Sequence, residues 1–216
     1  MESKKQGEFQ GNRLYESRGN FGTHDLEAML RTLEELKKGR KVRIPKYDKS
    51  ARDGRGDQRP ESEWMVVKDK PQVILVEGWC LGYRALNENE LEKVLEQRET
   101  SSDLIHVCKY SSQEIKQLNR YAKRYQELYD LFDSFVLMYT PDYHTLVYDW
   151  RYEQEVRSNG GKLDRKGVAK FVDRFMPAYE LYLGRLLKNG LFEEVGERQL
   201  FVEIDRDRGV VSCMQR

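Results

Sequence analysis

The sequence has 216 residues, enough for one well-packed domain or at most two small ones. Charged residues make up 35% of it, but 38 basic and 37 acidic side chains leave a formal net charge of only +1, which does not favour a dedicated nucleic-acid or membrane binder. No apolar stretch approaches the roughly 20 residues of a membrane span, and the N-terminus has no hydrophobic signal region.

The cysteines and histidines are too scattered to build a metal site. Three cysteines form neither a metal-ligand spacing nor a disulfide framework, so we expect a reducing compartment, the cytoplasm, with the nucleus also open. We expect no zinc site. The sequence leaves the oligomeric state open.

The N-terminal third alternates between irregular and regular stretches. Residues 1–22 are polar and are expected to be an irregular lead-in. A stripe of leucines predicts a helix over 25–38, with Thr23 as the candidate N-cap and Gly39 as the stop. A short strand at 42–44 ends at Pro45, and the charged residues 47–63 are expected to be a long loop, of the kind that is usually functional or disordered.

Residues 73–76 form a continuous aliphatic run without the alternation of a half-buried strand. Such a run is typical of a parallel strand covered by helices on both faces, so we predict an interior parallel strand over 70–77. Glu77 follows at the carboxyl end, where ligands collect in open α/β sheets. There its carboxylate would hold Mg²⁺ or its waters, or accept a proton from an acceptor hydroxyl. The alternative is a Glu that only closes the strand.

The rest of the chain alternates between helices and strands, which indicates an α/β fold. The expected elements are helices at 88–99, 113–132 and 141–156, a loop at 100–112, a strand at 134–139 with the same buried pattern as 73–76, a glycine break at Gly160 and Gly161, a helical pair over 164–187 interrupted at Pro177, and two strands within 199–214.

Three further stretches gather residues suited to ligand binding. In residues 17–26, a cation and glycines at a helix start make an anion site, or an ordinary glycine loop. Residues 45–57 are charged and contain two glycines, so they would reach over a pocket or remain a solvated loop. Arg151 and Glu155 fall on one helix face as an i, i+4 pair. The pair is either part of a ligand site or an ion pair that only stabilises the helix surface.

The order of these motifs resembles the D-glycerate 3-kinase family and its fungal relatives, ATP-dependent kinases of P-loop, uridine-kinase-like fold. The matching stretches read SRGNFGTHD (17–25), IPKYDKS to GRGD (44–57), VEGWCLGY (76–83), YTPD (139–142), YDWRYEQE (148–155) and FVDRFMPAYELY (171–182). They cover essentially the whole chain. The resemblance implies a single domain over 1–216 with a P-loop NTPase-like parallel sheet flanked by helices.

The resemblance also implies roles for individual residues. Glu77 would be the acidic residue that ends the Walker-B-type strand, beside Mg²⁺ and the transferred phosphoryl group. Arg151 would lie in the lid over the nucleotide phosphates. The acceptor side would be lined by Arg18, His24, Asp25, Tyr47, Asp48 and Arg55. The implied partners are ATP with Mg²⁺ and a small acceptor such as glycerate, with no nucleic acid or membrane, and the acceptor itself stays open.

One departure from the family pattern is clear. The sequence contains no G-x-x-x-x-G-K-[ST] motif, whose backbone N–H groups and Lys cradle the β- and γ-phosphates. The N-terminal P-loop strand and helix are therefore missing from the expected fold, and we expect residues 1–216 alone to bind ATP·Mg²⁺ weakly or not at all and to be inactive. The readings are an ATP-dependent small-molecule kinase, a non-catalytic relative acting as a binding or regulatory protein, and a truncated product.

Overall fold

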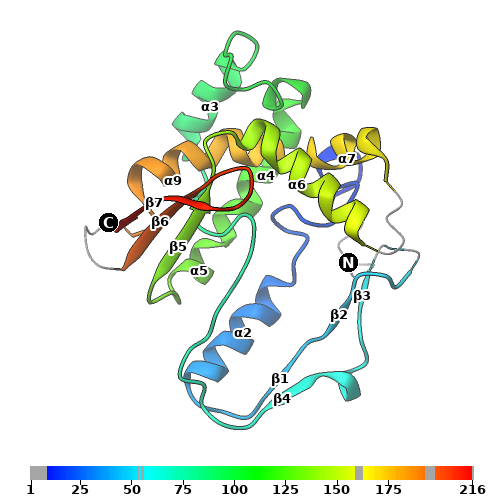
Figure 1. The fold of residues 1–216 in the computed structure, drawn as a ribbon, viewed down its shortest axis with the longest axis vertical. Coiled ribbons are helices and arrows are strands. Elements are labelled where there is room, and N and C mark those ends of the chain that lie inside the picture. Colours follow the sequence, from blue (N-terminus) through cyan, green and yellow to red (C-terminus); the bar gives the residue numbers. More distant parts are fainter. Residues whose placement is uncertain (1–8, 53, 55, 159–162, 193–197, 216) are drawn as a thin grey trace.

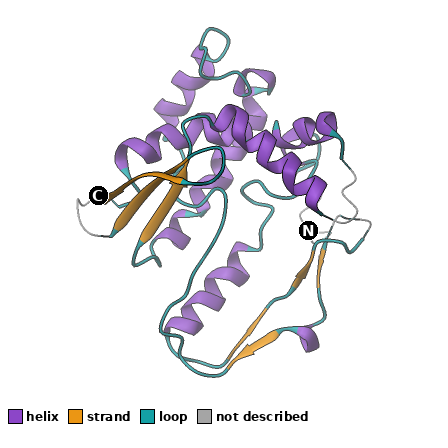
Figure 2. Cartoon of the chain, in the orientation of Figure 1, coloured by secondary structure: helices purple, strands orange, loops and turns teal. Residues whose placement is uncertain are grey.

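The computed structural model describes residues 9–52, 54, 56–158, 163–192 and 198–215. It has a body of helices packed against one face of a three-stranded sheet, and an elongated lobe that contains the helix α2 (Leu26–Lys37), the short helix η2 (Glu61–Glu63) and two short strand pairs (Figures 1 and 2). The predicted glycine break at Gly160 and Gly161, the first eight residues of the lead-in and the candidate site residue Arg55 lie outside the described residues.

The helix of the lobe, α2 (Leu26–Lys37), confirms the predicted helix over 25–38. Its N-cap is Asp25 rather than Thr23, because the Asp25 carboxylate accepts a hydrogen bond from the Ala28 N–H at 3.1 Å. Gly39 ends the helix as predicted. Its φ of +71° is a conformation that glycine adopts without strain.

The charged loop over 47–63 is more ordered than its composition predicts. The strand β1 (Val42–Ile44) is confirmed and pairs antiparallel with β4 (Met65–Val67). Further along the loop, β2 (Tyr47–Asp48) pairs with β3 (Asp57–Gln58), and a short helix, η2 (Glu61–Glu63), follows. These pairings fold the loop back on itself.

The main sheet has the order β5-β6-β7. The strand β5 (Phe135–Tyr139) runs parallel to β6 (Gln199–Ile204), which pairs antiparallel with β7 (Val210–Gln215). The strands at both predicted places are confirmed. However, β5 has a single neighbour among the described strands, and Met138 is 62% exposed, so the expected burial of both faces is wrong. Only its inward face packs on the core.

The predicted interior strand over 70–77 is absent. The segment contains no strand hydrogen bonds, and Val73 and Leu75 are 82% and 79% exposed. Ile74 and Val76 point the other way and pack against the core. An apolar run becomes an interior strand only when other strands pair with both of its edges, and within the described part of the chain none pairs with it.

The longer helices of the body follow the predicted pattern with one division, whereas the short helices η1 (Arg13–Tyr15) and η3 (Val107–Lys109) lie in the stretches 1–22 and 100–112 that were expected to be irregular. The predicted helices of the body are α3 (Glu88–Gln97), α4 (Ser112–Arg124), α5 (Gln126–Tyr129) and α6 (Tyr143–Arg157). Capping boxes begin α3 and α4, where Asn87 and Ser111 exchange hydrogen bonds with a glutamate three residues later. The helix expected over 113–132 is divided at Tyr125, so its second part is the separate α5.

The helical pair expected over 164–187 is a series of four helices. They are α7 (Arg165–Val172), α8 (Met176–Ala178), the π-helix η4 (Tyr179–Leu183) and α9 (Gly184–Asn189). The interruption lies at residues 173–175, just before Pro177. Pro177 sits in the first turn of α8, where a missing N–H is tolerated.

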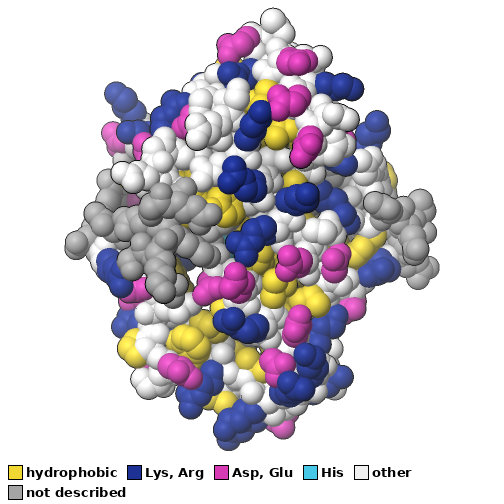
Figure 3. All heavy atoms as spheres, turned by 180° about the vertical axis from the view of Figure 1, so that it is seen from behind, with side chains coloured by type: hydrophobic (Ala, Val, Ile, Leu, Met, Phe, Trp, Pro, Cys, Tyr) yellow, Lys and Arg dark blue, Asp and Glu magenta, His cyan; other side chains and the backbone are white. Residues whose placement is uncertain are grey.

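The buried hydrophobic residues form two clusters. The larger extends through α2, α4, α5, η4 and α9 to the sheet. The smaller joins α6 to α7 and α8 around Val168, Val172 and Met176. On the face drawn in Figure 3, basic and acidic side chains are interspersed. Within the described ranges, no helix is both long and apolar enough to cross a lipid bilayer.

Candidate functional site

The structure brings together two of the predicted ligand-binding stretches. Arg18 donates a hydrogen bond to the backbone carbonyl of Gly54 at 2.8 Å, and its guanidinium lies 5.6 Å from the centre of the Tyr47 ring. Gly56 packs directly on that ring, because a Cβ atom there would lie 2.3 Å from the Tyr47 hydroxyl. The 17–26 stretch and the charged loop therefore meet at Arg18.

Asp48 shapes the charged loop from within. Its carboxylate accepts hydrogen bonds from the hydroxyl and the backbone N–H of Ser50 at 2.6 and 2.9 Å, and pairs with Arg59 at 2.6 Å. The bonds from Ser50, with the nearby Arg59, lower the pKa of Asp48. This carboxylate therefore stays ionised and fixes the turn that faces Arg18.

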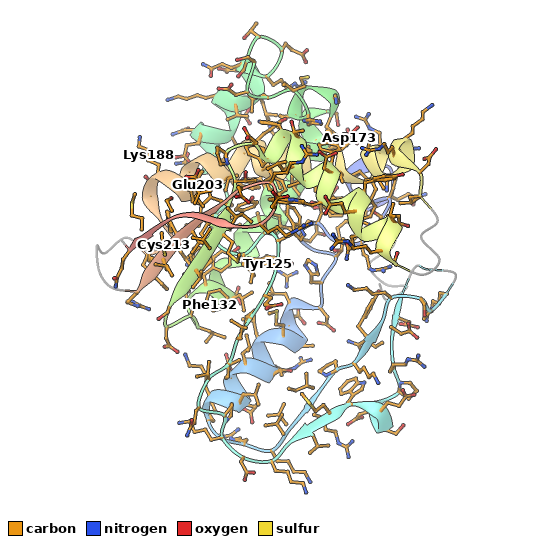
Figure 4. All side chains as sticks on the ribbon, viewed as in Figure 1. Tyr125, Phe132, Asp173, Lys188, Glu203 and Cys213 are labelled. Carbon is orange, nitrogen blue, oxygen red and sulfur yellow. The ribbon has the colours of Figure 1, made fainter. Side chains whose placement is uncertain are left out.

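His24 and Asp25 face different parts of the molecule. His24 Nδ1 lies 2.5 Å from the hydroxyl of Tyr125, at the junction of α4 and α5, where Figure 4 labels Tyr125. The surrounding protein disfavours a charge there and lowers the pKa of His24, although part of the residue stays exposed. Asp25 caps α2, so its position is fixed by that helix.

Glu77 is exposed and has no hydrogen-bond or ion-pair partner among the described residues. In the turn after it, the Trp79 indole N–H donates to the Gly19 carbonyl at 2.9 Å, which joins this turn to the loop of Arg18. A single exposed carboxylate without a partner among the described residues suits Mg²⁺, which binds one or two carboxylates and completes its shell with phosphates and water. No cluster of three or more potential metal-ligating side chains occurs within the described ranges.

Arg151 is held by two contacts on the α6–α7 pair. The predicted i, i+4 ion pair is present, with Arg151 Nη1 2.6 Å from Glu155 Oε2. The guanidinium also lies 5.1 Å from the centre of the Phe171 ring of α7. A carboxylate and an aromatic face together fix the direction of this cation.

A group of aromatic rings connects these charged residues, and sequence reasoning missed it. Trp79 contacts Phe175 at 5.2 Å, and Phe175 contacts Phe171 at 5.0 Å between ring centroids. Gly19 packs on the Phe175 ring, where an added Cβ would lie at 2.7 Å. We call these three rings the aromatic bridge. It links the loop of Arg18, the turn after Glu77 and the support of Arg151, and the spacing of the two phenylalanines was its only sequence signal.

A cavity of about 530 Å³ opens beside Arg151 on α6. Its lining includes three arginines and one glutamate together with two aromatic rings, namely Arg151, Arg157, Arg208, Glu153, Trp150 and Tyr179. Trp79 of the aromatic bridge stacks on Tyr179, with centroids 5.5 Å apart. The excess of positive charge and the flat rings suit a ligand that is both anionic and aromatic.

Trp150 and Arg208 were not predicted as site residues. Arg208 lies in the turn between β6 and β7, with a φ of +65°, and its guanidinium is 5.2 Å from the centre of the Trp150 ring. It also pairs with Glu153 at 3.1 Å. Because the two stretches are more than fifty residues apart, no local pattern could have joined them.

Comparison with curated proteins identifies kinases. The chain is 35% identical to the chloroplastic D-glycerate 3-kinase of Arabidopsis thaliana over 210 residues, covering 93% of this chain and 42% of that protein. It is 33% identical to the uncharacterized kinase mug58 of Schizosaccharomyces pombe, over 81% of this chain and 62% of that protein. The probable ATP-dependent kinase TDA10 of Saccharomyces cerevisiae is 28% identical, over 97% and 70%. The chain thus spans less than two thirds of the first two relatives.

Two solved structures share the fold. D-glycerate 3-kinase from Cryptococcus neoformans superimposes with a TM-score of 0.84 at 27% identity, covering 98% of this chain and 73% of that one. The YGR205w protein superimposes with a TM-score of 0.74 at 28% identity, covering 99% and 71%. No family model matches the sequence. The mixed α/β arrangement of helices and small sheets is common to all three.

Proposed function

Because the chain belongs to one family with D-glycerate 3-kinase and the fungal ATP-dependent kinases, as its motifs predicted, we propose that the protein transfers a phosphoryl group from ATP to a hydroxyl of a small acceptor such as glycerate. The observation that carries the proposal is that the aromatic bridge joins three segments. It packs on Gly19, next to Arg18, and it includes Trp79, two residues after Glu77. It also supports Arg151 through Phe171. Two cations and one unpartnered carboxylate are among the groups that such a transfer uses.

The cavity beside Arg151 supports a nucleotide side. In a loose phosphoryl-transfer transition state, negative charge moves toward the leaving oxygen and the equatorial oxygens, and positioned cations stabilise it. Arg151, already fixed by Glu155 and Phe171, would strengthen its contact as that charge develops. The Trp150 indole, with Arg208 over its ring, lines the same cavity and would contact the nucleotide base.

The loops around Arg18 support an acceptor side. Arg18 would bind the anionic group of the acceptor, with Tyr47 beneath its guanidinium and His24 on the other side of the loop. Asp25 and Asp48 would act here by fixing the two loops, and Arg55 belongs to the same stretch. Glu77 would accept the hydroxyl proton as the new O–P bond forms and the bond to the ADP oxygen breaks.

Mg²⁺ is the cofactor that this carboxylate fits best. Glu77 would be its single protein carboxylate, and the ion would neutralise phosphate charge when bound with ATP.

We also propose a P-loop NTPase-like sheet and a cytoplasmic location for the protein. The parallel pair β5–β6 supports the first, and the three free cysteines support a reducing compartment.

An acceptor-dependent assay tests the proposal. The protein, expressed from its full-length reading frame, is incubated with ATP, Mg²⁺ and D-glycerate, and ADP release and the phosphorylated product are measured. We expect ADP release that depends on the acceptor. ATP binding by calorimetry without turnover of D-glycerate or of other small hydroxy acids would instead favour the non-catalytic binding role.

A further inference from the structure

A buried carboxylate lies in the π-helix η4, behind the proposed nucleotide cavity. The Glu180 side chain has no exposed area. It accepts hydrogen bonds from the backbone N–H groups of His106 and Val107 at 3.0 and 2.9 Å, and from His106 Nδ1 at 2.6 Å. Three donors satisfy this carboxylate in a place where an unpaired charge would be costly, and π-helices often occur at functional sites.

His106 extends this arrangement toward α6. Its Nε2 lies 3.1 Å from the hydroxyl of Tyr148 and 3.5 Å from Asp173 Oδ1. Tyr148 donates a hydrogen bond of 2.7 Å to that Asp173 oxygen, so Nε2 donates to the Tyr148 oxygen when the imidazole carries both protons. Asp173 lies beyond the end of α7, where α7 approaches α6 in Figure 4. Burial and the bond to Asp173 raise the pKa of Tyr148, so the hydroxyl keeps its proton and remains a donor.

The four side chains, which we call the polar relay, come from four separate segments. Glu180 is in η4, His106 precedes η3, Tyr148 is in α6 and Asp173 follows α7. The α6–α7 pair has its own small hydrophobic cluster, so the relay is a polar connection between this pair and the body. Tyr148 precedes Arg151 by three residues, which places both on adjacent turns of one face.

We propose that the polar relay is a positioning device that holds α6 against the body, so that Arg151 faces the nucleotide cavity. The link to the nucleotide rests on the proposed function, whereas the hold on α6 does not. His106 and Tyr148 act through Arg151 and are positioning residues. A hydrogen-bonded network that begins at a fully buried carboxylate, Glu180, and ends at the 40% exposed Asp173 side chain favours one arrangement of the helices it joins.

Amide hydrogen exchange of α6 tests the hold directly. Tyr148→Phe keeps the ring in the small cluster and removes only the hydroxyl. We expect exchange of the α6 amides to rise about tenfold, the effect of losing one hydrogen bond to a charged group. Tyr152→Phe is the matched control, because its hydroxyl, on the same helix, makes no hydrogen bond to the described residues. Equal exchange in Tyr148→Phe and the control would overturn the proposal.

A second measurement tests whether the hold serves Arg151. His106→Asn keeps a donor toward Glu180 but no longer reaches Tyr148, so it should raise the exchange rate of the α6 amides as Tyr148→Phe does. Combining the two substitutions should raise that rate little further, because both remove the same contact. Affinity for ATP·Mg²⁺ should fall by a similar factor in both single variants. The control is Arg151→Ala, which should weaken ATP binding. If it does, and the two relay variants exchange faster but bind ATP as tightly as wild type, the link between the relay and Arg151 is refuted. These affinities are measured on the protein expressed from its full-length reading frame. If that protein does not bind ATP, the proposed function fails, while exchange still decides whether the relay holds α6.

Discussion

Glu77 is exposed to solvent and has no partner among the described residues. Glu77→Gln keeps its size and removes its charge. We expect kcat of the full-length protein to fall roughly 10²-fold, since one electrostatic contributor is lost, while Tm stays nearly unchanged because no folded-state contact is broken. Steady-state kinetics and a thermal melt measure the two effects.

The control for this change is Glu96→Gln. Glu96 is also exposed and without a partner in the described part of the chain, but it lies on α3. The Glu96→Gln substitution should leave kcat and Tm unchanged. Wild-type turnover in Glu77→Gln would mean that Glu77 has no part in the reaction.

Arg151 is fixed by contacts on both sides, so its removal has two separable effects. Arg151→Ala should raise the KM for ATP more than the KM for the acceptor, because the cation belongs to the nucleotide side. It should also lower Tm, since the Glu155 side chain is only 12% exposed and loses its ion pair. Adding Glu155→Gln should restore much of the Tm but none of the KM. A KM for ATP equal to that of the exposed control Arg120→Ala would contradict this role.

At the scale of elements, helices were the most predictable part of the chain. The α3 and α6 helices lie close to their predicted ranges, because caps and periodicity are local signals. The division at Tyr125 and the π-helix η4 were not predicted, since both depend on packing against other segments. The hairpin of β6 and β7 was found from its polar turn.

The wrong prediction of a strand over 70–77 shows why strands are harder. An aliphatic run reports that a segment is apolar, but pairing requires neighbouring strands that the run itself does not encode. In the described structure only Ile74 and Val76 reach the core. For the same reason, β5 was correctly identified as a strand while its exposure was not.

Glu114 of α4 connects this helix to the N-terminal loop. Burial alone would raise its pKa, but hydrogen bonds from Arg13 and Ser111 outweigh it and lower the pKa from 4.5 to about 2. A lowered folded-state pKa stabilises the fold above the unfolded pKa. This contribution is lost as the pH falls from about 4.5 to about 2.

Glu114→Gln should therefore destabilise the protein by about 2 kcal/mol at pH 7. Urea denaturation measures this loss as a free energy of unfolding. Most of the difference between variant and wild type should disappear at about pH 2.5, because this pH lies far below the unfolded pKa of Glu114 and close to its folded-state pKa. The exposed Glu127→Gln should show no difference at either pH. A loss of equal size at both pH values would mean that the effect is packing rather than charge.

At the scale of the whole molecule, the candidate site is assembled from segments far apart in the chain. The sequence proposed Arg18, Glu77 and Arg151 as site residues because each lies in a distinctive local motif, and their roles stay predictions. It did not identify the aromatic bridge, the cavity lining or the polar relay, because these form only when the segments meet. Arg208 and His106 are ordinary residues in the sequence and take on a role only through their partners in the fold.

Trp79 and Trp150 make the same kind of local contact in two different parts of this assembly. Trp79 donates its indole N–H to the Gly19 carbonyl at 2.9 Å, next to Arg18, and Trp150 donates to the Arg206 carbonyl at 2.8 Å, beside the cavity. Replacing either by Phe removes one hydrogen bond and keeps an aromatic ring, so each should cost about 1 kcal/mol of stability. Their effects on catalysis should differ. Trp79→Phe should raise the KM for the acceptor severalfold, and Trp150→Phe the KM for ATP. Equal effects of both variants on both KM values would show that the two sides are not separate.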